Sequence, residues 1–154
     1  FSHLEKKLGD VTLCIAGKGE LLEEIKDLVG KMGLRKVLFL GYVDDQDLPD
    51  LYACADYYIM TSKYEGLPLT LLEAMASGLP CIVSDIPNLE IVRDADCGII
   101  LNYGDVSSAS DQILDYISSD HSDHAKNARR YALNHLDWHI ISEQYLEEFA
   151  DLVR

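Results

Sequence analysis

The chain has 154 residues, which is enough for one domain with a single sizeable core. Its 27 acidic and 13 basic residues give a formal net charge of −14, which opposes binding to nucleic acid or to an anionic membrane surface. No apolar run reaches the roughly 18 residues that a membrane span needs, and the first residues form no hydrophobic signal region. We therefore expect a globular protein of the cytoplasm without a transmembrane segment.

Five short apolar runs recur at regular intervals along the chain. They are VTLCIAG from Val11, VLFLG from Val37, DYYIMTS from Asp56, PCIVSD from Pro80 and CGIIL from Cys97. Continuous apolar runs of this length are typical of strands buried on both faces. Helical patterns separate the runs, one of them with Leu21, Ile25, Leu28, Val29 and Met32 on one face. Alternation of strand and helix predicts parallel strands with helices on both faces.

The whole chain, residues 1–154, is therefore expected to be one α/β domain with a Rossmann-like, doubly wound parallel sheet. Three closing helices follow the last strand: one has an apolar stripe from Val106, one spans about residues 122–134, and the last has an apolar stripe from Trp138. We expect the side chain of Trp138 in the core. Such sheets normally begin with a strand, whereas this chain opens with SHLEKKLGD, which resembles the last turns of a helix. We expect the first βα unit to be missing and the exposed edge to promote association.

Residues of the metal-binding types form no pattern that predicts a metal site. The four cysteines, Cys14, Cys54, Cys81 and Cys97, lie far apart and are expected to be buried free thiols. Asp94-Ala95-Asp96 falls in the turn before a strand, where acidic residues favour the bend. The histidines His121, His124, His135 and His139 are expected at the surface, and no Glu of an HExxH motif lies between the last two.

The segment after the third strand is the first candidate site, because ligands bind beyond the carboxyl ends of parallel strands. Tyr64-Glu65-Gly66-Leu67-Pro68-Leu69-Thr70 indicates a loop that turns into a helix. Gly66 allows a ligand to approach the backbone, and Pro68 is expected at the first helical position. The backbone N–H groups at this helix start, those of Leu67, Leu69 and Thr70, suit phosphate oxygens.

Glu73 is the one charged residue of the helix LTLLEAMASG. Burying an ionised carboxylate between Leu72 and Met75 is costly unless the carboxylate has a partner. A ribose diol could be that partner, because it offers two hydroxyl donors. Alternatively, Glu73 bonds a neighbouring backbone amide or faces solvent, and Glu65 is a solvated loop acid. Spacing by itself leaves these alternatives open.

The segment SKYEGLPLTLLEAMASGLPCIVSD resembles the signature of the retaining GT-B glycosyltransferases of the GT4-like, group 1 class. The E-x7-E motif of that class is matched by Glu65 and Glu73. The stretches AGKGE, VLFLGYV, DLPDLYACADYYIMTS and IVRDADCGIIL also resemble the C-terminal, nucleotide-sugar-binding half of those enzymes, so the likeness covers nearly the whole chain. The resemblance implies a nucleotide-sugar-binding domain of a glycosyltransferase.

The resemblance also implies roles for individual residues. Glu65 would lie near the transferred sugar and act in catalysis, and Glu73 would hold the ribose hydroxyls. The backbone of residues 66–70 would receive the donor diphosphate. Tyr42 and Val43 would line the base, and Gly17 would shape a turn after an earlier strand. The donor would be a UDP- or GDP-sugar, and no cofactor or metal is expected, because the leaving diphosphate is stabilised electrostatically in that class.

The resemblance implies that two parts of the family pattern would lie upstream of Phe1: the Arg and Lys diphosphate clamp and the N-terminal half that binds the acceptor. Lys18 and Lys63 are the nearest basic residues, and neither occupies the clamp position. We therefore expect retaining transfer of a hexose to a glycan or lipid-linked acceptor. The missing N-terminal domain would bind this acceptor, and it could also make the protein peripheral to a membrane. Two alternatives stay open: a separate nucleotide-sugar-binding subunit that needs a partner acceptor domain, and a nucleotide-sugar epimerase of the same fold, against which the E-x7-E spacing argues.

Overall fold

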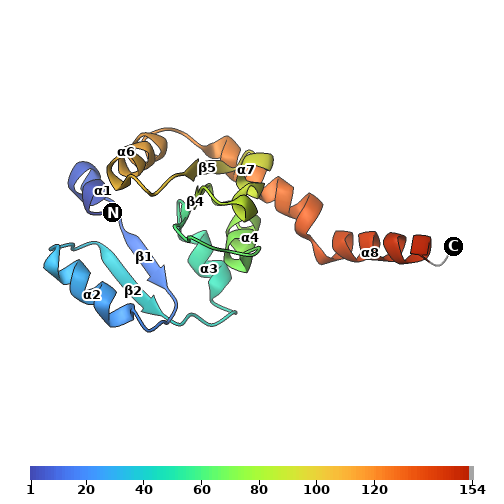
Figure 1. The fold of residues 1–154 in the computed structure, drawn as a ribbon, viewed down its shortest axis with the longest axis horizontal. Helices are drawn as coiled ribbons and strands as arrows, with labels where there is room; N and C mark the ends of the chain where they lie inside the picture. Colours follow the sequence, from blue (N-terminus) through green and yellow to red (C-terminus); the bar gives the residue numbers. More distant parts are fainter. Residues whose placement is uncertain (153–154) are drawn as a thin grey trace.

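The structure is a computed structural model that describes residues 1–152 (Figure 1). All five predicted strands form: β1 (Leu13–Ala16), β2 (Val37–Gly41), β3 (Tyr58–Met60), β4 (Cys81–Ser84) and β5 (Gly98–Leu101). The helices before and between them are α1 (Ser2–Leu8), α2 (Leu22–Lys31), α3 (Leu48–Ala53), α4 (Leu69–Ala76), the short 3₁₀ helix η1 (Pro87–Leu89) and α5 (Ile91–Asp94). The predicted α/β fold with parallel strands is confirmed.

Three helices close the described chain, as the apolar stripes predict. They are α6 (Val106–Ile117), α7 (Ser122–Tyr131), which continues into the π-helical turn η2 (Ala132–Leu136), and α8 (Trp138–Leu152). Asp105 caps α6, because its carboxylate accepts the N–H groups of Ser107 and Ser108, each at 3.1 Å. Figure 1 shows α8 leading away from the rest of the protein. Neither α8 nor any other helix within residues 1–152 is both long and apolar enough to cross a membrane.

The five strands divide between two parallel sheets. One sheet contains β1 and β2, and the other contains β3, β4 and β5 in that order. Leu13 aligns with Val37 in the first sheet, and Cys81 aligns with both Tyr58 and Gly98 in the second. The arrangement differs in this respect from the one continuous sheet that the sequence predicts: within residues 1–152 no strand joins β1 to β3.

The backbones of β4 and β5 approach each other so closely at one point that only glycine fits. A Cβ atom on Gly98 would lie 1.8 Å from the carbonyl oxygen of Cys81 and 2.7 Å from its carbonyl carbon. All four residues of β4 are buried, so this strand has little room to move aside. Gly98 therefore sets the spacing of the two strands.

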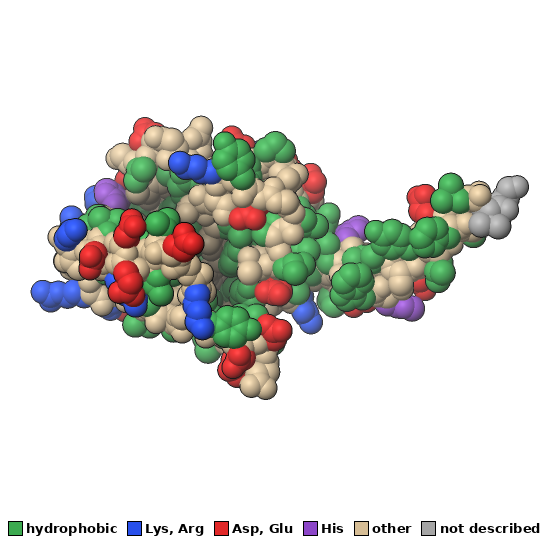
Figure 2. Space-filling view, turned by 60° about the horizontal axis from the view of Figure 1, so that its bottom comes forward, with side chains coloured by type: hydrophobic (Ala, Val, Ile, Leu, Met, Phe, Trp, Pro, Cys, Tyr) green, Lys and Arg blue, Asp and Glu red, His purple; other side chains and the backbone are tan. Residues whose placement is uncertain are grey.

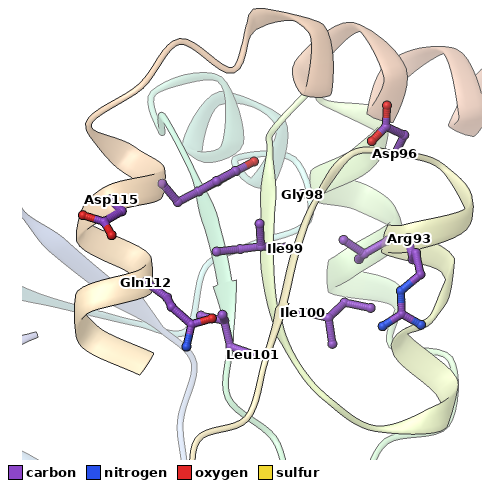
Figure 3. A pocket seen from close by; sticks show the side chains of 10 residues that line it. Arg93, Asp96, Gly98, Ile99, Ile100, Leu101, Gln112 and Asp115 are labelled. Atoms are coloured by element: carbon purple, nitrogen blue, oxygen red, sulfur yellow. The ribbon is translucent and has the colours of Figure 1, made fainter. Parts of the chain in front are cut away.

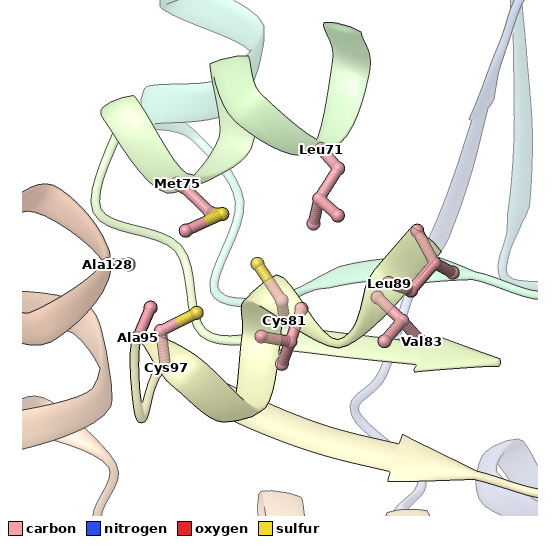
Figure 4. Close-up of a cluster of buried hydrophobic side chains, with 9 residues drawn as sticks. Leu71, Met75, Cys81, Val83, Leu89, Ala95, Cys97 and Ala128 are labelled. Atoms are coloured by element: carbon pink, nitrogen blue, oxygen red, sulfur yellow. The ribbon is translucent and has the colours of Figure 1, made fainter. Parts of the chain in front are cut away.

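The main core lies between α4 and the second sheet (Figure 4). Leu71 and Met75 of α4 point toward Cys81 and Val83 of β4, and all four side chains are fully buried. Full burial of one such side chain stabilises the fold by about 1.5–3 kcal/mol. This packing holds α4 on the sheet and thereby fixes the position of the loop that precedes it.

Two predicted apolar helix faces form but remain exposed. Ile25 and Leu28 of α2, with Leu21 and Met32 at its two ends, are between 39% and 59% exposed, whereas Val29 is half-buried. In α8 the exposed apolar side chains include Trp138, which is 81% exposed, so its predicted place in the core is wrong for the described chain. Figure 2 shows apolar side chains along this extended helix. The helical period is correct in both cases, and no element within residues 1–152 buries these faces.

The burial of several cysteines and histidines also differs from the prediction. All four cysteines are free, but only Cys81 and Cys97 are buried, whereas Cys14 and Cys54 are exposed. His121 and His124 are half-buried rather than fully at the surface, because both stack on Tyr116. The Tyr116 hydroxyl lies 2.7 Å from Nδ1 of His124. His135 and His139 are exposed, as predicted.

Candidate functional site

The loop between β3 and α4 leads into a helix whose first backbone N–H groups are not all hydrogen-bonded within residues 1–152. Pro68 has extended backbone (φ −72°, ψ 121°) and takes the N-cap position, so α4 begins one residue later than predicted. The carbonyl oxygen of Pro68 accepts the N–H groups of Leu71 at 3.1 Å and Leu72 at 3.4 Å. The first N–H groups of a helix have no intrahelical acceptor. Those of Leu69 and Thr70 have no partner within residues 1–152 and are free to bind an anion.

The same loop is open to solvent along its length. The side chains of Leu67 and Leu69 are 56% and 71% exposed, and the N–H of Leu67 has no partner within the described residues. No atom lies within 4 Å of the position that a Cβ on Gly66 would take. Gly66 therefore leaves the backbone accessible from this side, as the sequence predicts.

Glu73 lies one turn into α4 and is half-buried. The hydroxyl of Tyr52, on α3, donates a hydrogen bond to Oε2 of Glu73 at 2.9 Å. The same hydroxyl lies 3.3 Å from the carbonyl oxygen of Thr70. The carboxylate is thus held by a side chain from another helix, and not by a neighbouring backbone amide. Oε1 has no partner within residues 1–152, so it remains available as an acceptor.

A second tyrosine contacts the first turn of α4. The hydroxyl of Tyr58, on β3, lies 2.8 Å from Oγ1 of Thr70. Burial raises the pKa of Tyr58, and burial followed by the bond and charge of Glu73 raises the pKa of Tyr52. Both phenols are therefore protonated at neutral pH, so Tyr52 donates to Glu73. No pattern in the segment that carries Tyr52 indicates its contact with Glu73, so sequence reasoning misses this residue.

Glu65 lies in the loop and is tied to the next loop of the sheet. The side-chain amide of Asn88 donates a hydrogen bond to the backbone carbonyl of Glu65 at 2.6 Å. Asn88 belongs to η1, which follows β4. The carboxylate of Glu65 is half-buried and has no hydrogen-bond partner within the described residues. The rule that ligands bind beyond the carboxyl ends of the strands indicates the region of Asn88, but sequence reasoning assigns this residue no role.

The ends of β1 and β2 form a second group. Gly17 follows β1 with φ 120°, a conformation that other residues rarely adopt, and its N–H donates to the carbonyl of Gly41 at 2.6 Å. Nζ of Lys18 lies 5.2 Å from the centre of the Tyr42 ring, within the range of a cation–π interaction. Tyr42 is 60% exposed and Val43 is half-buried. This geometry agrees with a turn-forming role for Gly17.

The structure thus collects the candidate residues into two groups at the carboxyl ends of the strands. One group surrounds the start of α4 and contains Glu65, Gly66, Leu67, Leu69, Thr70 and Glu73. The other contains Gly17, Tyr42 and Val43. No hydrogen bond within residues 1–152 joins the two groups directly. They are linked through α3, which follows the Tyr42 loop in the chain and carries Tyr52.

A cavity of about 490 Å³ lies elsewhere, on the outer side of β5 (Figure 3). Its lining includes Arg93, Asp96, Ile100, Gln112 and Asp115. β5 is the strand of its sheet farthest from β3, and no residue of either candidate group lines this cavity. The candidate residues lie instead at the carboxyl ends of the strands, in the loop before α4 and in the first two turns of that helix.

No group of three or more His, Cys, Asp or Glu side chains within residues 1–152 is arranged to hold a metal ion. Asp94 ends α5, and Asp96 takes a positive φ of 47° in the turn that leads into β5. Asp96 therefore lies in the turn that the sequence predicts, whereas Asp94 is the last residue of a helix.

Comparison with known proteins identifies the family. The model of the family "Glycosyl transferases group 1" matches residues 1–135. An alignment 136 positions long, which covers 81% of the chain, is 32% identical to the UDP-Gal:alpha-D-GlcNAc-diphosphoundecaprenol alpha-1,3-galactosyltransferase of Escherichia coli and covers 33% of that enzyme. An alignment 93 positions long, which covers 54% of the chain, is 41% identical to the mannosylfructose-phosphate synthase of Agrobacterium fabrum and covers 20% of it.

Solved structures share the fold. HepE of Anabaena, solved in complex with UDP-glucose, superposes with a TM-score of 0.82 at 24% identity, over 97% of this chain and 43% of HepE. TarM of S. aureus, solved as a mutant with UDP, superposes with a TM-score of 0.83 at 24% identity, over 95% of this chain and 30% of TarM. The chain therefore spans between 20% and 43% of the length of these four proteins. On the family match over residues 1–135, the chain belongs to the group 1 glycosyltransferase family.

Proposed function

We propose that this chain is the donor-binding part of a retaining glycosyltransferase and that its ligand is a nucleoside diphosphate sugar. One observation carries the proposal: the acceptor oxygen Oε1 of Glu73 and the free N–H groups of Leu69 and Thr70 belong to the first two turns of one helix. A nucleoside diphosphate offers the matching groups, namely hydroxyl donors on the ribose and anionic oxygens on the diphosphate.

Each group has one role in the proposed complex. Oε1 of Glu73 accepts a ribose hydroxyl while Tyr52 holds Oε2. The amides of residues 67, 69 and 70 bind diphosphate oxygens at the positive end of the α4 dipole. Tyr42 and Val43 line the base, and the carboxylate of Glu65 acts near the transferred sugar. The Escherichia coli galactosyltransferase is named for UDP-Gal, and HepE was solved in complex with UDP-glucose. Both names support this ligand class.

The chemistry assigned to the site is stabilisation of the leaving diphosphate during transfer of a hexose. Negative charge develops on the diphosphate as the bond to the sugar breaks, and fixed N–H groups stabilise that charge without needing to reorient. The proposal assigns no step to a protein-bound metal. A glycan or lipid-linked acceptor would be held by a separate acceptor-binding domain, which would also account for any association with a membrane surface.

The test is an amide NMR titration of the chain with UDP, GDP and ADP at millimolar concentration. Shifts are expected at Gly66, Leu69, Thr70 and Val43, and the nucleotide that binds tightest identifies the base of the donor. Glu73→Gln keeps the size of the side chain but removes its charge, and is expected to weaken binding about tenfold, because hydrogen bonds to charged groups are worth about 1.5–3 kcal/mol.

The matched control is Glu24→Gln, which changes an exposed glutamate of α2 and is expected to leave the affinity unchanged. Two results would contradict the proposal: equal affinity of wild type and Glu73→Gln, or no shift at these amides with any of the three nucleotides while the protein remains folded.

A further inference from the structure

Two buried thiols lie next to each other in the second sheet. Cys81 is the first residue of β4, and Cys97 is the residue before β5. Both side chains are fully buried and belong to one core cluster beneath α4. Both thiols are free, and the functional site uses neither of them. Two adjacent thiols have a reaction that a single buried thiol lacks, because together they can form a disulfide.

The backbone brings the two residues within disulfide range. The N–H of Cys81 donates a hydrogen bond to the carbonyl oxygen of Cys97 at 2.9 Å, and Cys81 aligns with Gly98, the next residue. Neighbouring strands lie about 4.8 Å apart, and a disulfide joins Cα atoms that are about 4.4–6.8 Å apart. The pair therefore meets the backbone requirement for a disulfide.

The two side chains also share one face of the sheet. In a regular strand Cys97 would point away from the face of Cys81, because its neighbour Gly98 aligns with Cys81. Cys97, however, precedes β5 and lies outside the strand, and its side chain joins the same cluster as Cys81. Figure 4 shows the side chain of Cys97 directed toward Cys81. The two sulfur atoms can therefore meet by rotation of the side chains.

A hydrogen bond between the thiols makes them chemically unequal. This bond lowers the pKa of Cys97, whereas the same bond, followed by burial, raises the pKa of Cys81. Cys97 therefore loses its proton first. The thiolate is the reactive form of cysteine, so Cys97 is the nucleophile of the pair and Cys81 is its partner.

The turn before β5 lies beside Cys97 and is held by α7. Asp96 is exposed and takes a positive φ of 47° in this turn. The side-chain amide of Asn127 donates to the backbone carbonyl of Asp96 at 2.9 Å and to its carboxylate at 3.2 Å. Nε2 of His124 lies 3.7 Å from the same carboxylate. Contacts from one helix thus fix the turn that separates Cys97 from solvent.

The cavity on the outer side of β5 reaches this turn. Its lining includes Asp96 and Gly98, the two neighbours of Cys97, but not Cys97 itself (Figure 3). Its volume of about 490 Å³ is ample for a small hydroperoxide. Opening of the Asp96 turn would connect the cavity with the sulfur atom of Cys97.

We propose that Cys81 and Cys97 are an oxidation site, at which a hydroperoxide that enters through the Asp96 turn converts the two thiols to a disulfide. The thiolate of Cys97 attacks one peroxide oxygen, the O–O bond breaks, and the leaving alkoxide takes up the proton that Cys97 released. Cys97 is then a sulfenic acid. The sulfur of Cys81 attacks the sulfur of Cys97, the S–O bond breaks, and hydroxide leaves as water with the proton of Cys81. Two electrons pass from the thiols to the peroxide, which becomes an alcohol and water.

The disulfide closes a loop that contains η1 and α5. η1 carries Asn88, whose side-chain amide holds the backbone carbonyl of Glu65. Oxidation therefore restrains the segment that contacts the loop before α4. The reaction of the thiols does not depend on which ligand that loop binds.

The test is treatment of the folded full-length protein with tert-butyl hydroperoxide, followed by N-ethylmaleimide and mass spectrometry of the unreduced digest. Peptides joined through Cys81 and Cys97 are expected, and dithiothreitol should separate them. Cys14 and Cys54 are exposed and serve as internal references. In untreated protein they are expected to react with N-ethylmaleimide at least about 100-fold faster than the buried pair.

Asn127→Ala tests the route through the turn. It removes both hydrogen bonds to Asp96 and is expected to speed disulfide formation about 3- to 10-fold, because the turn opens more often. Asn134→Ala is the matched control. This asparagine of η2 is exposed and has no hydrogen bond to the turn within residues 1–152, so the rate should equal that of wild type.

Three results would overturn the proposal. Oxidation of Cys14 or Cys54 while Cys81 and Cys97 stay reduced would mean that the buried pair is not an oxidation site. A disulfide that forms only in urea concentrations that unfold the protein would belong to the unfolded chain. Equal rates for Asn127→Ala and wild type would exclude the route through the Asp96 turn. The first two results come from the wild-type protein, so they do not depend on the folding of a variant.

Discussion

The hydroxyl of Tyr52 lies 2.9 Å from Oε2 of Glu73, and this hydrogen bond joins α3 to the helix that carries the candidate phosphate-binding amides. Replacing Tyr52 by Phe removes the bond and keeps the ring. One net hydrogen bond is worth about 0.5–1.5 kcal/mol, so the Kd of the nucleotide that binds best is expected to rise about 2- to 10-fold. The measurement is the NMR titration described above.

Tyr58→Phe is the matched control for this contact. It removes the bond to Oγ1 of Thr70 and leaves the partner of Glu73 in place, so its effect on Kd is expected to be smaller. Equal Kd values for wild type and Tyr52→Phe would show that Tyr52 does not position the carboxylate for the ligand.

A buried hydroxyl without a partner predicts a stabilising substitution. The hydroxyl of Tyr103 is buried and has no hydrogen-bond partner in the described structure. Tyr103→Phe removes this unpaired group and is expected to raise the free energy of unfolding by about 1 kcal/mol. Urea unfolding measures this change. Tyr116→Phe is the contrasting variant, because it breaks the 2.7 Å contact with His124 and is expected to lower the same quantity. A loss of stability in both variants would refute the assignment of Tyr103 as unpaired.

Stability is expected to fall in alkaline solution because of buried tyrosines. Burial raises the pKa of Tyr103 to about 12, and burial also raises the pKa of Tyr52 and Tyr116. The ordinary pKa of tyrosine is about 10, so above that pH the folded protein binds more protons than the unfolded chain. This contribution is complete below pH 10 and is lost as the pH rises through the folded-state values.

Urea midpoints measured between pH 8 and pH 11 test this expectation. These tyrosines are expected to leave the urea midpoint unchanged up to about pH 9 and to lower it at higher pH. Tyr103→Phe should show a shallower decrease than wild type. An identical slope in the variant would mean that Tyr103 is not a source of the alkaline destabilisation.

Two glycines are expected to respond in opposite directions to replacement by alanine. Gly98→Ala would place a methyl group 1.8 Å from the carbonyl oxygen of Cys81, so β4 and β5 must separate. Overpacking of this kind costs about 1–3 kcal/mol. Gly30 lies within α2, and no atom lies within 4 Å of the position of its added Cβ. Gly30→Ala is therefore expected to stabilise by about 0.5–1 kcal/mol.

Urea unfolding of Gly98→Ala, Gly30→Ala and wild type measures the change in the free energy of unfolding. If Gly98→Ala were as stable as wild type, β4 and β5 could not be as close as the structure places them. If Gly30→Ala were destabilised, the backbone at Gly30 could not be helical.

The sequence by itself determined the strands, several of the helices and the segment that carries the candidate site. These features depend on local patterns: an apolar run such as CIVS forms a buried strand, and a glycine and a proline before LTLLEAMA place a loop before a helix. The free amides of Leu69 and Thr70 follow from the same local rule, because every helix start leaves its first N–H groups without an intrahelical acceptor.

Only the tertiary structure decided how that segment is completed. The partner of Glu73 is Tyr52, 21 residues away, and the amide that holds the Glu65 carbonyl is that of Asn88, 23 residues away. The exposure of Trp138 and the separation of β1 from β3 depend likewise on which elements are present to cover them. Periodicity shows that a face is apolar, but packing in three dimensions determines whether another element buries it.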